Sequence, residues 1–343
     1  MVCDGRMGDL RMTVQSESAS LVSVIIVNWN GLHLLDACIS SLLAQTYKNF
    51  EIILVDNNSQ DNSVAYVNQR YPFVITEPLD SNRGFTGGNI AGYRIAQGDF
   101  IVLLNNDACL CERWLELMLN AIESDPKVGS CSAKILIEGT DLVDSVGDVF
   151  TSAFTGTKLG EHQNTNCYNE PVYVSGACAA AVMYRRAMLQ DIGFLDDDFF
   201  LNHEDTDLNM RSWLAGWKCR FVPDAVAYHK VSASIGALSD TSVYYFTRNN
   251  VWVWIKNVPF LLMLKYLPHR ILYEISLFVF FCILQKKWKS YLRGKRDALA
   301  GLPVMLKKRK QVQELVRLKT EEIEKSLVSL ASYLLKRVKN GIA

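Results

Sequence analysis

The sequence predicts an α/β protein whose mostly parallel sheet is flanked by helices, and two observations lead to this prediction. Short aliphatic runs at 22–27, 50–55 and 101–104 alternate with segments in which apolar residues recur at helical spacing. Apart from Ser23 and Glu51 the runs are apolar, as in strands buried on both faces of a parallel sheet, and each ends in polar residues. Because ligands bind at the carboxyl ends of such strands, the pattern predicts a nucleotide cleft.

The first two strands end in side chains that suit a nucleotide. The strand 22–27 leads to Asn28-Trp29-Asn30-Gly31, and we expect a helix from about 34 to 43. The strand 50–55 leads to Asp56, whose carboxylate can accept the imide N–H of a uracil or thymine ring. Alternatively, Asp56 caps the helix that is expected to begin at Asp61 or Ser63.

A glycine-rich segment, Asn82-Arg-Gly-Phe-Thr-Gly-Gly-Asn89, follows a short strand at 74–75 and begins a helix that runs through Ala96. Gly84 and its neighbours allow the backbone to approach a ribose or a pyrophosphate closely. The spacing matches neither the Walker loop nor the Gly-x-Gly-x-x-Gly fingerprint, so it favours neither an NTPase nor a dehydrogenase.

The strand 101–104 ends in Asn105-Asn106-Asp107. A hard cation that holds phosphates needs carboxylate oxygens in such a place, so Asp107 is a candidate metal ligand. The alternative is an ordinary turn, because Asn and Asp favour turns.

The chain beyond this strand is expected to complete the site. After a helix at 114–122, residues 139–172 are rich in Gly, Thr, Asn and Asp and are interpreted as a lid or an excursion over the site. A buried strand of small residues is expected at 174–184. A further strand at 219–228 leads to His229, just before the small-residue segment 232–236. His229 fits a metal ligand or a phosphate donor, although a lone histidine is more often structural.

Glu204 and Asp205 are expected to begin a helix that runs to about Ala215. Carboxylates at a helix N-terminus are stabilised by the helix dipole and tend to stay ionised, as a catalytic base must be. A solvated acidic cap is the alternative. It suits residues 196–198 better than Glu204-Asp205, which follow the apolar run 199–201.

Together these motifs resemble the family 2 glycosyltransferases of the GT-A fold, a Rossmann-like nucleotide-diphospho-sugar transferase architecture, and most closely their bacterial rhamnosyltransferase-like branch. The resemblance covers about residues 21–305. The motifs that carry it, in order, are 24–31 (Val-Ile-Ile-Val-Asn-Trp-Asn-Gly), 54–59 (Leu-Val-Asp-Asn-Asn-Ser), 82–89, 104–107 (Leu-Asn-Asn-Asp), Glu204-Asp205 and His229.

The resemblance implies an inverting transfer of a sugar, with rhamnose as a candidate, from a dTDP- or UDP-sugar to a lipid-linked or cell-surface glycan. It implies that Asp56 contacts the base and that Asn28, Asn30, Asn82, Gly84 and Asn105 lie near the ribose and phosphates. Asp107 takes the metal position of the family's Asp-x-Asp motif, and Asn105 stands where that motif has its first acid. His229 resembles the later metal or diphosphate contact, with Mg²⁺ or Mn²⁺ as the cation. Asp205 corresponds to the base, and Glu204 is either the base or a residue that orients the acceptor.

The C-terminal region is basic and partly apolar. From Gln285 onward it has 16 Lys and Arg residues against 5 Asp and Glu, although the whole chain has 36 of each. The apolar runs 259–267 and 271–284 are each shorter than a spanning helix needs, so we expect helices that lie in a membrane interface. A buried helical subdomain is the alternative. An apolar stripe over 312–338 is expected to support oligomerisation or membrane docking.

These observations divide the chain into a disordered lead-in at 1–20, a glycosyltransferase domain at 21–255 and a helical, basic region at 256–343. Nine scattered cysteines without paired Cys-x-x-Cys units indicate a reducing compartment and no zinc. We therefore expect a cytoplasmic protein, peripheral at the inner face of the membrane, that binds no nucleic acid.

Two alternative functions fit the sequence less well. A sugar-phosphate nucleotidyltransferase would need a basic, glycine-rich loop after the first strand, which Asn28-Trp29-Asn30-Gly31 does not supply. A non-catalytic sugar-nucleotide-binding protein would not need Asp107, Glu204, Asp205 and His229 together.

Overall fold

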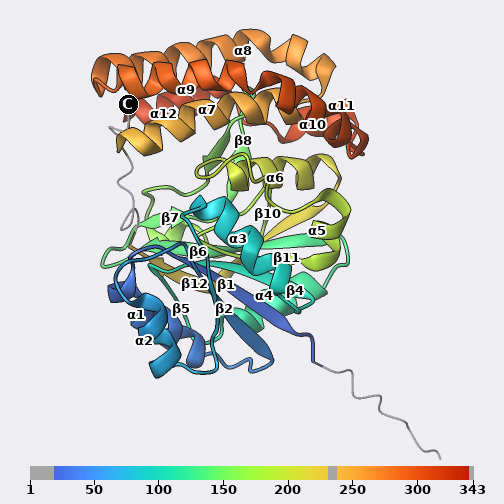
Figure 1. Cartoon of the computed structure of the whole chain (residues 1–343). Coiled ribbons are helices and arrows are strands. Elements are labelled where there is room, and N and C mark those ends of the chain that lie inside the picture. The colour runs from blue at the N-terminus through green and yellow to red at the C-terminus, as the bar shows by residue number, and fades with distance from the viewer. Residues whose placement is uncertain (1–18, 231–237, 340–343) are drawn as a thin grey trace, which may run out of the picture.

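The computed structural model describes residues 19–230 and 238–339 (Figure 1). Nearly all of the expected lead-in at 1–20, and the small-residue segment 232–236, lie outside the described residues.

Within that described part, ten strands form one mixed sheet in the order β10-β12-β6-β11-β4-β1-β2-β3, with β5 paired to β12 and β7 paired to β6 (Figure 1). Strands β8 and β9 form a separate hairpin. The bounds are β1 Val22–Asn28, β2 Phe50–Asp56, β3 Ile75–Pro78, β4 Phe100–Asn105, β5 Ala108–Leu110, β6 Val128–Ile137, β7 Val143–Ser145, β8 Asp148–Phe150, β9 Gly156–Lys158, β10 Tyr173–Val174, β11 Ala181–Arg185 and β12 Lys218–His229.

The N-terminal half of the sheet is parallel, as predicted. Strands β3, β2, β1 and β4 are parallel neighbours, and the register pairs Asn28 with Asp56 and Val27 with Asn105. The polar ends of these strands therefore lie at one edge of the sheet. Strand β11 runs antiparallel to both β4 and β6, whereas β6 and β12 are parallel to each other.

Helices cover both faces of the sheet, because the strands are apolar on both sides. Helices α1 (Leu32–Leu43) and α4 (Trp114–Glu123) contribute to one hydrophobic core. Helices α3 (Gly84–Ile95), α5 (Arg186–Ile192) and α6 (Glu204–Leu214) contribute to the other, and α2 (Ser63–Arg70) packs at the β3 end. Helix α3 lies so close to β1 that a Cβ on Gly88 would be 2.6 Å from Val27.

The structure adds detail to the middle of the chain. Residues 139–172, expected as a lid or excursion over the site, contain β7, β8, β9 and the 3-10 helix η1 (Thr165–Cys167). The single strand expected at 174–184 is two strands, since β10 pairs with β12 and β11 pairs with β4 and β6. Strand β6 was not predicted, because its first half, Val-Gly-Ser-Cys-Ser, is buried but not aliphatic.

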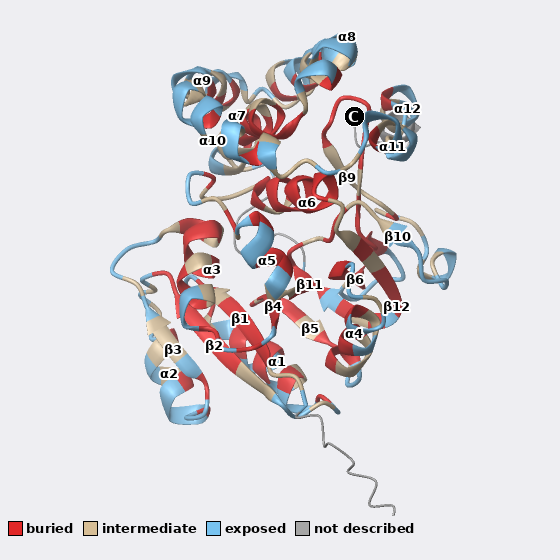
Figure 2. Ribbon diagram, turned by 90° about the vertical axis from the view of Figure 1, so that its right-hand side faces the viewer, coloured by how far each residue is buried: buried red, intermediate tan, exposed pale blue. Residues whose placement is uncertain are grey.

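The C-terminal helices form a layer on one side of the sheet domain, with α6 between them and the sheet (Figures 1 and 2). Their bounds are α7 Asp240–Asn257, α8 Phe260–Phe278, η2 Val279–Leu284, α9 Trp288–Ala300, α10 Leu302–Glu314, α11 Thr320–Ser326 and α12 Leu330–Lys339. The domain boundary expected after residue 255 falls inside α7. The stripe at 312–338 spans three helices, and its Val312, Ile323 and Leu330 are buried against the body.

The expectation of two separate short apolar helices was also wrong. Helix α8 continues into the π-helix η2 without a break, so residues Phe260–Leu284 form one helix of 25 residues. It is the one helix in the described residues that is long and apolar enough to cross a membrane, judged by length and composition. The interrupting charges do not break it because Arg270 and Glu274 face the protein and pair with each other at 2.5 Å.

A buried ion network joins the helical layer to the sheet domain. Lys256 of α7 lies 2.6 Å from Asp196 and 2.9 Å from Asp207, and Asp207 also pairs with Arg211 at 2.9 Å. Lys308 of α10 contacts Asp196 as well. Because Asp207 belongs to α6, this network fixes the acidic helix against α7.

Candidate active site

The ends of β1 and β2 hold two predicted nucleotide-binding side chains in one hydrogen-bonded unit. Asn28 Nδ2 donates to Asp56 Oδ1 at 3.1 Å, and the Ser59 N–H donates to Asp56 Oδ2 at 2.8 Å. Asp56 therefore stabilises the turn after its own strand and does not cap α2. Asn28 and Asp56 are buried, so their orientation is fixed, whereas Asn30 is exposed beside them and donates its N–H to Ser59 Oγ at 2.8 Å.

The glycine-rich segment begins α3 directly against the loop that precedes α6. Asn57 Nδ2 donates to the Gly84 carbonyl at 2.9 Å, and Asn82 Oδ1 accepts from the Gly84 N–H at 2.8 Å. Gly84 has a φ of +70°, and a Cβ there would lie 2.3 Å from the carbonyl oxygen of Phe200. Only glycine fits this position. Asn82 itself is exposed at the rim.

The end of β4 brings three predicted residues together. His229 Nε2 lies 3.3 Å from Asp107 Oδ1 and 3.3 Å from Asn105 Nδ2. The contact arises because β12 pairs with β5 in a register that places His229 opposite Ala108. Asp107 and His229 are both buried. A carboxylate oxygen and an imidazole nitrogen therefore converge where the sequence predicted a cation.

Asp144 is a site residue that sequence reasoning missed. Its Oδ2 lies 3.1 Å from His229 Nδ1, and its Oδ1 accepts from Lys158 Nζ at 2.5 Å. Burial alone would lower the pKa of His229, but the hydrogen bonds of Asp107 and Asp144 outweigh it and raise the pKa to about 9. Burial would raise the pKa of Asp144, but His229 and Lys158 lower it to about 2. Asp144 thus orients His229 as an outer carboxylate does in metal sites.

The base candidates at the start of α6 lie next to the end of β4. The Ala179 N–H donates to the Asp205 carboxylate, and the carbonyl of the adjacent Ala180 accepts from the Asn105 N–H at 3.0 Å. Asp205 Oδ1 also accepts from the Thr206 N–H at 2.7 Å. Ala179 and Ala180, neighbours in one loop, therefore connect Asp205 to the end of β4, just before the candidate metal ligand Asp107.

The two acids differ in their environment. Glu204 Oε2 is buried and has no hydrogen-bond partner in the described residues. Burial, and then the charge of Asp205, raise the pKa of Glu204 to about 8. Burial also raises the pKa of Asp205, and the N–H groups of Thr206 and Ala179 limit that rise. The helix dipole was expected to keep both acids ionised, but burial raises the pKa of Glu204 against that tendency.

A third buried acid, Asp148 on β8, lies beside Asp205. Its Oδ2 accepts from Asn209 Nδ2 at 3.2 Å, and burial followed by the charge of Asp205 raises its pKa to about 7. Lys158, on the paired strand β9, lowers the pKa of both Asp148 and Asp205. The β8–β9 hairpin therefore forms one wall of the site. No sequence signal marked Asp148 or Lys158, because the strands are only three residues long.

The loop before Glu204 has an unusual backbone that α7 holds in place. Phe200, Asn202 and His203 have φ values of 63°, 64° and 67°. Asn249 of α7 donates through Nδ2 to the carbonyls of Phe199, Leu201 and Asn202 at 2.9, 2.8 and 2.7 Å. Non-glycine residues adopt this region only when the surroundings impose it. The C-terminal helices therefore position the acids.

The predicted residues form two groups connected by one loop. The first contains Asn28 and Asp56, with Asn30, Asn82 and Gly84 around it, and the second contains Asn105, Asp107, His229, Glu204 and Asp205.

Nowhere in residues 19–230 and 238–339 do three or more His, Cys, Asp or Glu side chains form a group that could hold a metal by itself. A cation at Asp107 and His229 would therefore need oxygens from a ligand, as Mg²⁺ commonly takes from phosphates.

Comparisons with known proteins agree with this geometry. The family model described as Glycosyl transferase family 2 matches residues 23–193. An uncharacterized glycosyltransferase of Nostoc sp. is 27% identical over 51% of this chain and 54% of its own. The N-acetylglucosaminyl-diphospho-decaprenol L-rhamnosyltransferase of Mycobacterium tuberculosis is 26% identical over 63% of this chain and 78% of its own.

A solved structure shows the same fold. The chain resembles the crystal structure of GalNAc-T7 with UDP, GalNAc and Mn²⁺ with a TM-score of 0.56 and 16% identity, over 70% of this chain and 48% of that one. The chain thus spans about half the length of the Nostoc relative and of GalNAc-T7. The GT-A-like arrangement predicted from the sequence is confirmed.

Proposed function

Since residues 23–193 place the chain in glycosyl transferase family 2, we propose that it transfers a sugar from a nucleoside-diphosphate donor to a glycan hydroxyl with inversion. Two contacts at the end of β4 carry the proposal. Asp107 and His229 lie within 3.3 Å of each other, and the Ala179-Ala180 loop connects Asp205 to the same end of the strand. The donor is a dTDP- or UDP-sugar. Rhamnose is the first candidate, because the mycobacterial relative is named a rhamnosyltransferase.

The donor lies across the ends of β1, β2 and β4. Asp56 is held by Asn28 and Ser59 so that its carboxylate accepts the imide N–H of the base. Asn30, Asn82 and the Gly84 backbone contact the ribose and phosphates from the rim, and Asn105 contacts the diphosphate beside His229.

Asp107 and His229 fit a divalent cation whose coordination would be completed by oxygens of the donor diphosphate. Their oxygen and nitrogen donors are of the kind that Mn²⁺ and Mg²⁺ accept, and Asp144 holds the imidazole through Nδ1 so that Nε2 faces Asp107. When bound, Mn²⁺ or Mg²⁺ neutralises the charge that develops on the departing diphosphate.

Asp205 is the catalytic base. It removes the proton of the acceptor hydroxyl, whose oxygen bonds to the anomeric carbon as the bond from that carbon to the diphosphate breaks. The nucleoside diphosphate leaves from the opposite face, so the anomeric configuration inverts. A raised pKa suits Asp205 to this role, since a base works best when its pKa approaches the working pH. Protonated Glu204 donates a hydrogen bond that orients the acceptor.

The acceptor is a lipid-linked glycan at the cytoplasmic face of the cell membrane. The mycobacterial relative is named for a diphospho-decaprenol acceptor, which is a lipid. All eight cysteines in the described residues are free thiols, as a reducing compartment favours.

The test is nucleotide release from a panel of dTDP-, UDP- and GDP-sugars with Mn²⁺ or Mg²⁺, followed by NMR of the product's anomeric proton. We expect metal-dependent turnover of one donor and a product of opposite anomeric configuration. Retention of configuration would contradict the single displacement. Failure of every sugar nucleotide to bind would overturn the proposed function itself.

A further inference from the structure

The helix formed by α8 and η2 carries a continuous apolar stripe that no other described element covers. Figure 1 shows α8 as the outermost layer of the molecule, and only 22% of its apolar window is buried. The exposed apolar residues recur every three or four positions and are Phe260, Leu261, Leu264, Leu267, Ile271, Leu272, Ile275, Phe278, Val279, Ile283 and Leu284. Over 25 residues the stripe extends about 37 Å, at a rise of about 1.5 Å per residue.

The opposite face of this helix is fastened to the body by polar contacts. Arg270 is buried and donates to Asn250 Oδ1 of α7 at 2.5 Å, and Glu274 pairs with Lys295 of α9 at 2.5 Å. A helix that crossed a bilayer would have to leave these partners and carry the two charges into lipid. Removing one partner of a buried pair is strongly destabilising, so the contacts favour a helix that stays on the protein.

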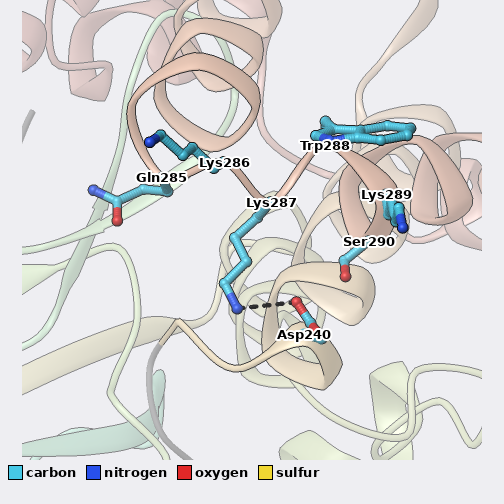
Figure 3. Close-up of a pocket in the computed structure, with 7 residues that line it drawn as sticks. All are labelled: Asp240, Gln285, Lys286, Lys287, Trp288, Lys289 and Ser290. Carbon is cyan, nitrogen blue, oxygen red and sulfur yellow. Dashed lines mark hydrogen bonds and ion pairs between the residues drawn. The ribbon is translucent and has the colours of Figure 1, made fainter.

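A basic pocket lies at the C-terminal end of the stripe. It has a volume of about 400 Å³ and is lined by Asp240, Gln285, Lys286, Lys287, Trp288, Lys289 and Ser290 (Figure 3). Lys287 pairs with Asp240 at 3.0 Å, whereas Lys286 and Lys289 have no acidic partner among the residues that the structure describes. Trp288 is half exposed beside them. Exposed lysines and an indole at the end of an apolar stripe match the boundary between acyl chains and headgroups.

We propose that α8 and η2 lie flat on an anionic phospholipid bilayer, with the apolar stripe at the acyl boundary and Lys286 and Lys289 at the headgroup phosphates. The occupant is a lipid surface because the stripe is long, unbroken and bordered by cationic side chains, which complements a negatively charged bilayer. The inference extends the proposed function, in which the acceptor is carried by a lipid, but the docking surface can be tested without any transfer.

The same helix contacts the β8–β9 hairpin, which lies beside the proposed base. His269 Nδ1 lies 2.8 Å from Ser152 Oγ, and the Thr155 hydroxyl donates to Tyr273 Oη at 3.2 Å. Ser152 and Thr155 form the turn between β8 and β9, whose strands carry Asp148 and Lys158 beside Asp205. The proposed docking helix therefore contacts the hairpin that forms one wall of the site.

The first experiment is sedimentation of the full chain with vesicles of phosphatidylcholine alone and with an equal share of phosphatidylglycerol. We expect binding to the anionic vesicles that weakens as salt rises, and release of the protein by alkaline carbonate. Protein that stays in the supernatant with both vesicles overturns the proposal. Protein that resists carbonate overturns it too, because the helix then spans the bilayer.

Paired variants locate the surface. Ile271→Glu with Ile275→Glu should abolish vesicle binding, and Lys286→Glu with Lys289→Glu should weaken it more than tenfold, at roughly fivefold per lysine. The matched controls are Phe73→Glu, an exposed apolar residue at the opposite end of the molecule, and Lys127→Glu. Equal losses in the controls overturn the assignment.

Nucleotide release measured without vesicles tests the proposed sugar transfer separately from the lipid-docking surface. Variants at all six positions should release nucleotide as the wild type does, because these residues are exposed and lie outside the site. Vesicle binding by a chain that turns over no donor would leave the docking surface standing and remove the proposed function.

Discussion

At the scale of single residues, Glu204 has the clearest consequence. It is a buried acid whose Oε2 has no hydrogen-bond partner in the part of the chain that the structure describes, and burial raises its pKa from 4.5 to about 8. The folded protein therefore binds this proton more tightly than the unfolded chain. The stability that this tighter binding contributes is fully present below pH 4.5 and is lost as the pH rises through 8. Such a group is retained for function more readily than for stability.

Glu204→Gln should therefore raise the melting temperature at pH 8 by a few degrees, and the gain should shrink toward pH 5, because glutamine has no proton to lose. Thermal unfolding at both pH values checks this, with the exposed Glu112→Gln as control. Equal gains at both pH values would contradict a protonated Glu204.

Asp144 is the second residue whose role follows from its contacts. It holds His229 Nδ1 at 3.1 Å and Lys158 at 2.5 Å. Asp144→Asn should raise the Mn²⁺ concentration for half-maximal nucleotide release by about 10–100-fold, the usual effect of losing an outer carboxylate. Exposed Asp141→Asn is the control. If Asp144→Asn lowers the rate without moving the Mn²⁺ dependence, Asp144 does not act through the metal ligand.

Among the helices and strands, the sequence predicts those that have a long enough hydrophobic pattern. Strands β1, β2 and β4 consist mainly of aliphatic residues, and α6 begins at Glu204 as expected. Strands β7, β8 and β9 have three residues each, too few for a period, so Asp144, Asp148 and Lys158 could not be placed. Helix α8 was divided because its charges looked like breaks, although their partners are on α7 and α9.

The loop that carries Glu204 and Asp205 depends on α7 through Asn249. Asn249→Asp keeps the shape of the side chain but removes the NH₂ group that donates to three carbonyls. We expect a loss of about 2–3 kcal/mol in the free energy of unfolding, because buried carbonyls lose their partners and a charge is buried. Urea unfolding measures it, and transfer should fall while donor binding remains. An unchanged stability would mean that the left-handed residues hold the loop alone.

At the scale of the whole molecule, the helical layer and the sheet domain share one buried network around Asp196 and Asp207. Burial alone would raise the pKa of Asp196, but Lys256 and Lys308 lower it to about 2. Its contribution to stability is therefore present above pH 3.8 and lost as the pH falls through 2.

Lys256→Met should destabilise the protein by about 3–5 kcal/mol, because it leaves two buried carboxylates short of a cation. Adding Asp207→Asn should recover part of that loss, as a double-mutant cycle would show. If the wild type unfolds in one transition and Lys256→Met unfolds in two, Lys256 couples the helical layer to the sheet domain. A loss below about 1 kcal/mol would indicate that Arg211 and Lys308 suffice.

In the proposed function, Asp205 removes the acceptor proton at a site where Asn28 and Asp56 hold the donor. The most direct measurement compares donor binding and sugar transfer for wild type, Asp205→Asn and the exposed control Asp80→Asn. We expect that Asp205→Asn binds the nucleotide sugar as the wild type does but transfers at least about 100-fold more slowly. Transfer at the wild-type rate by Asp205→Asn would contradict the assignment of the base.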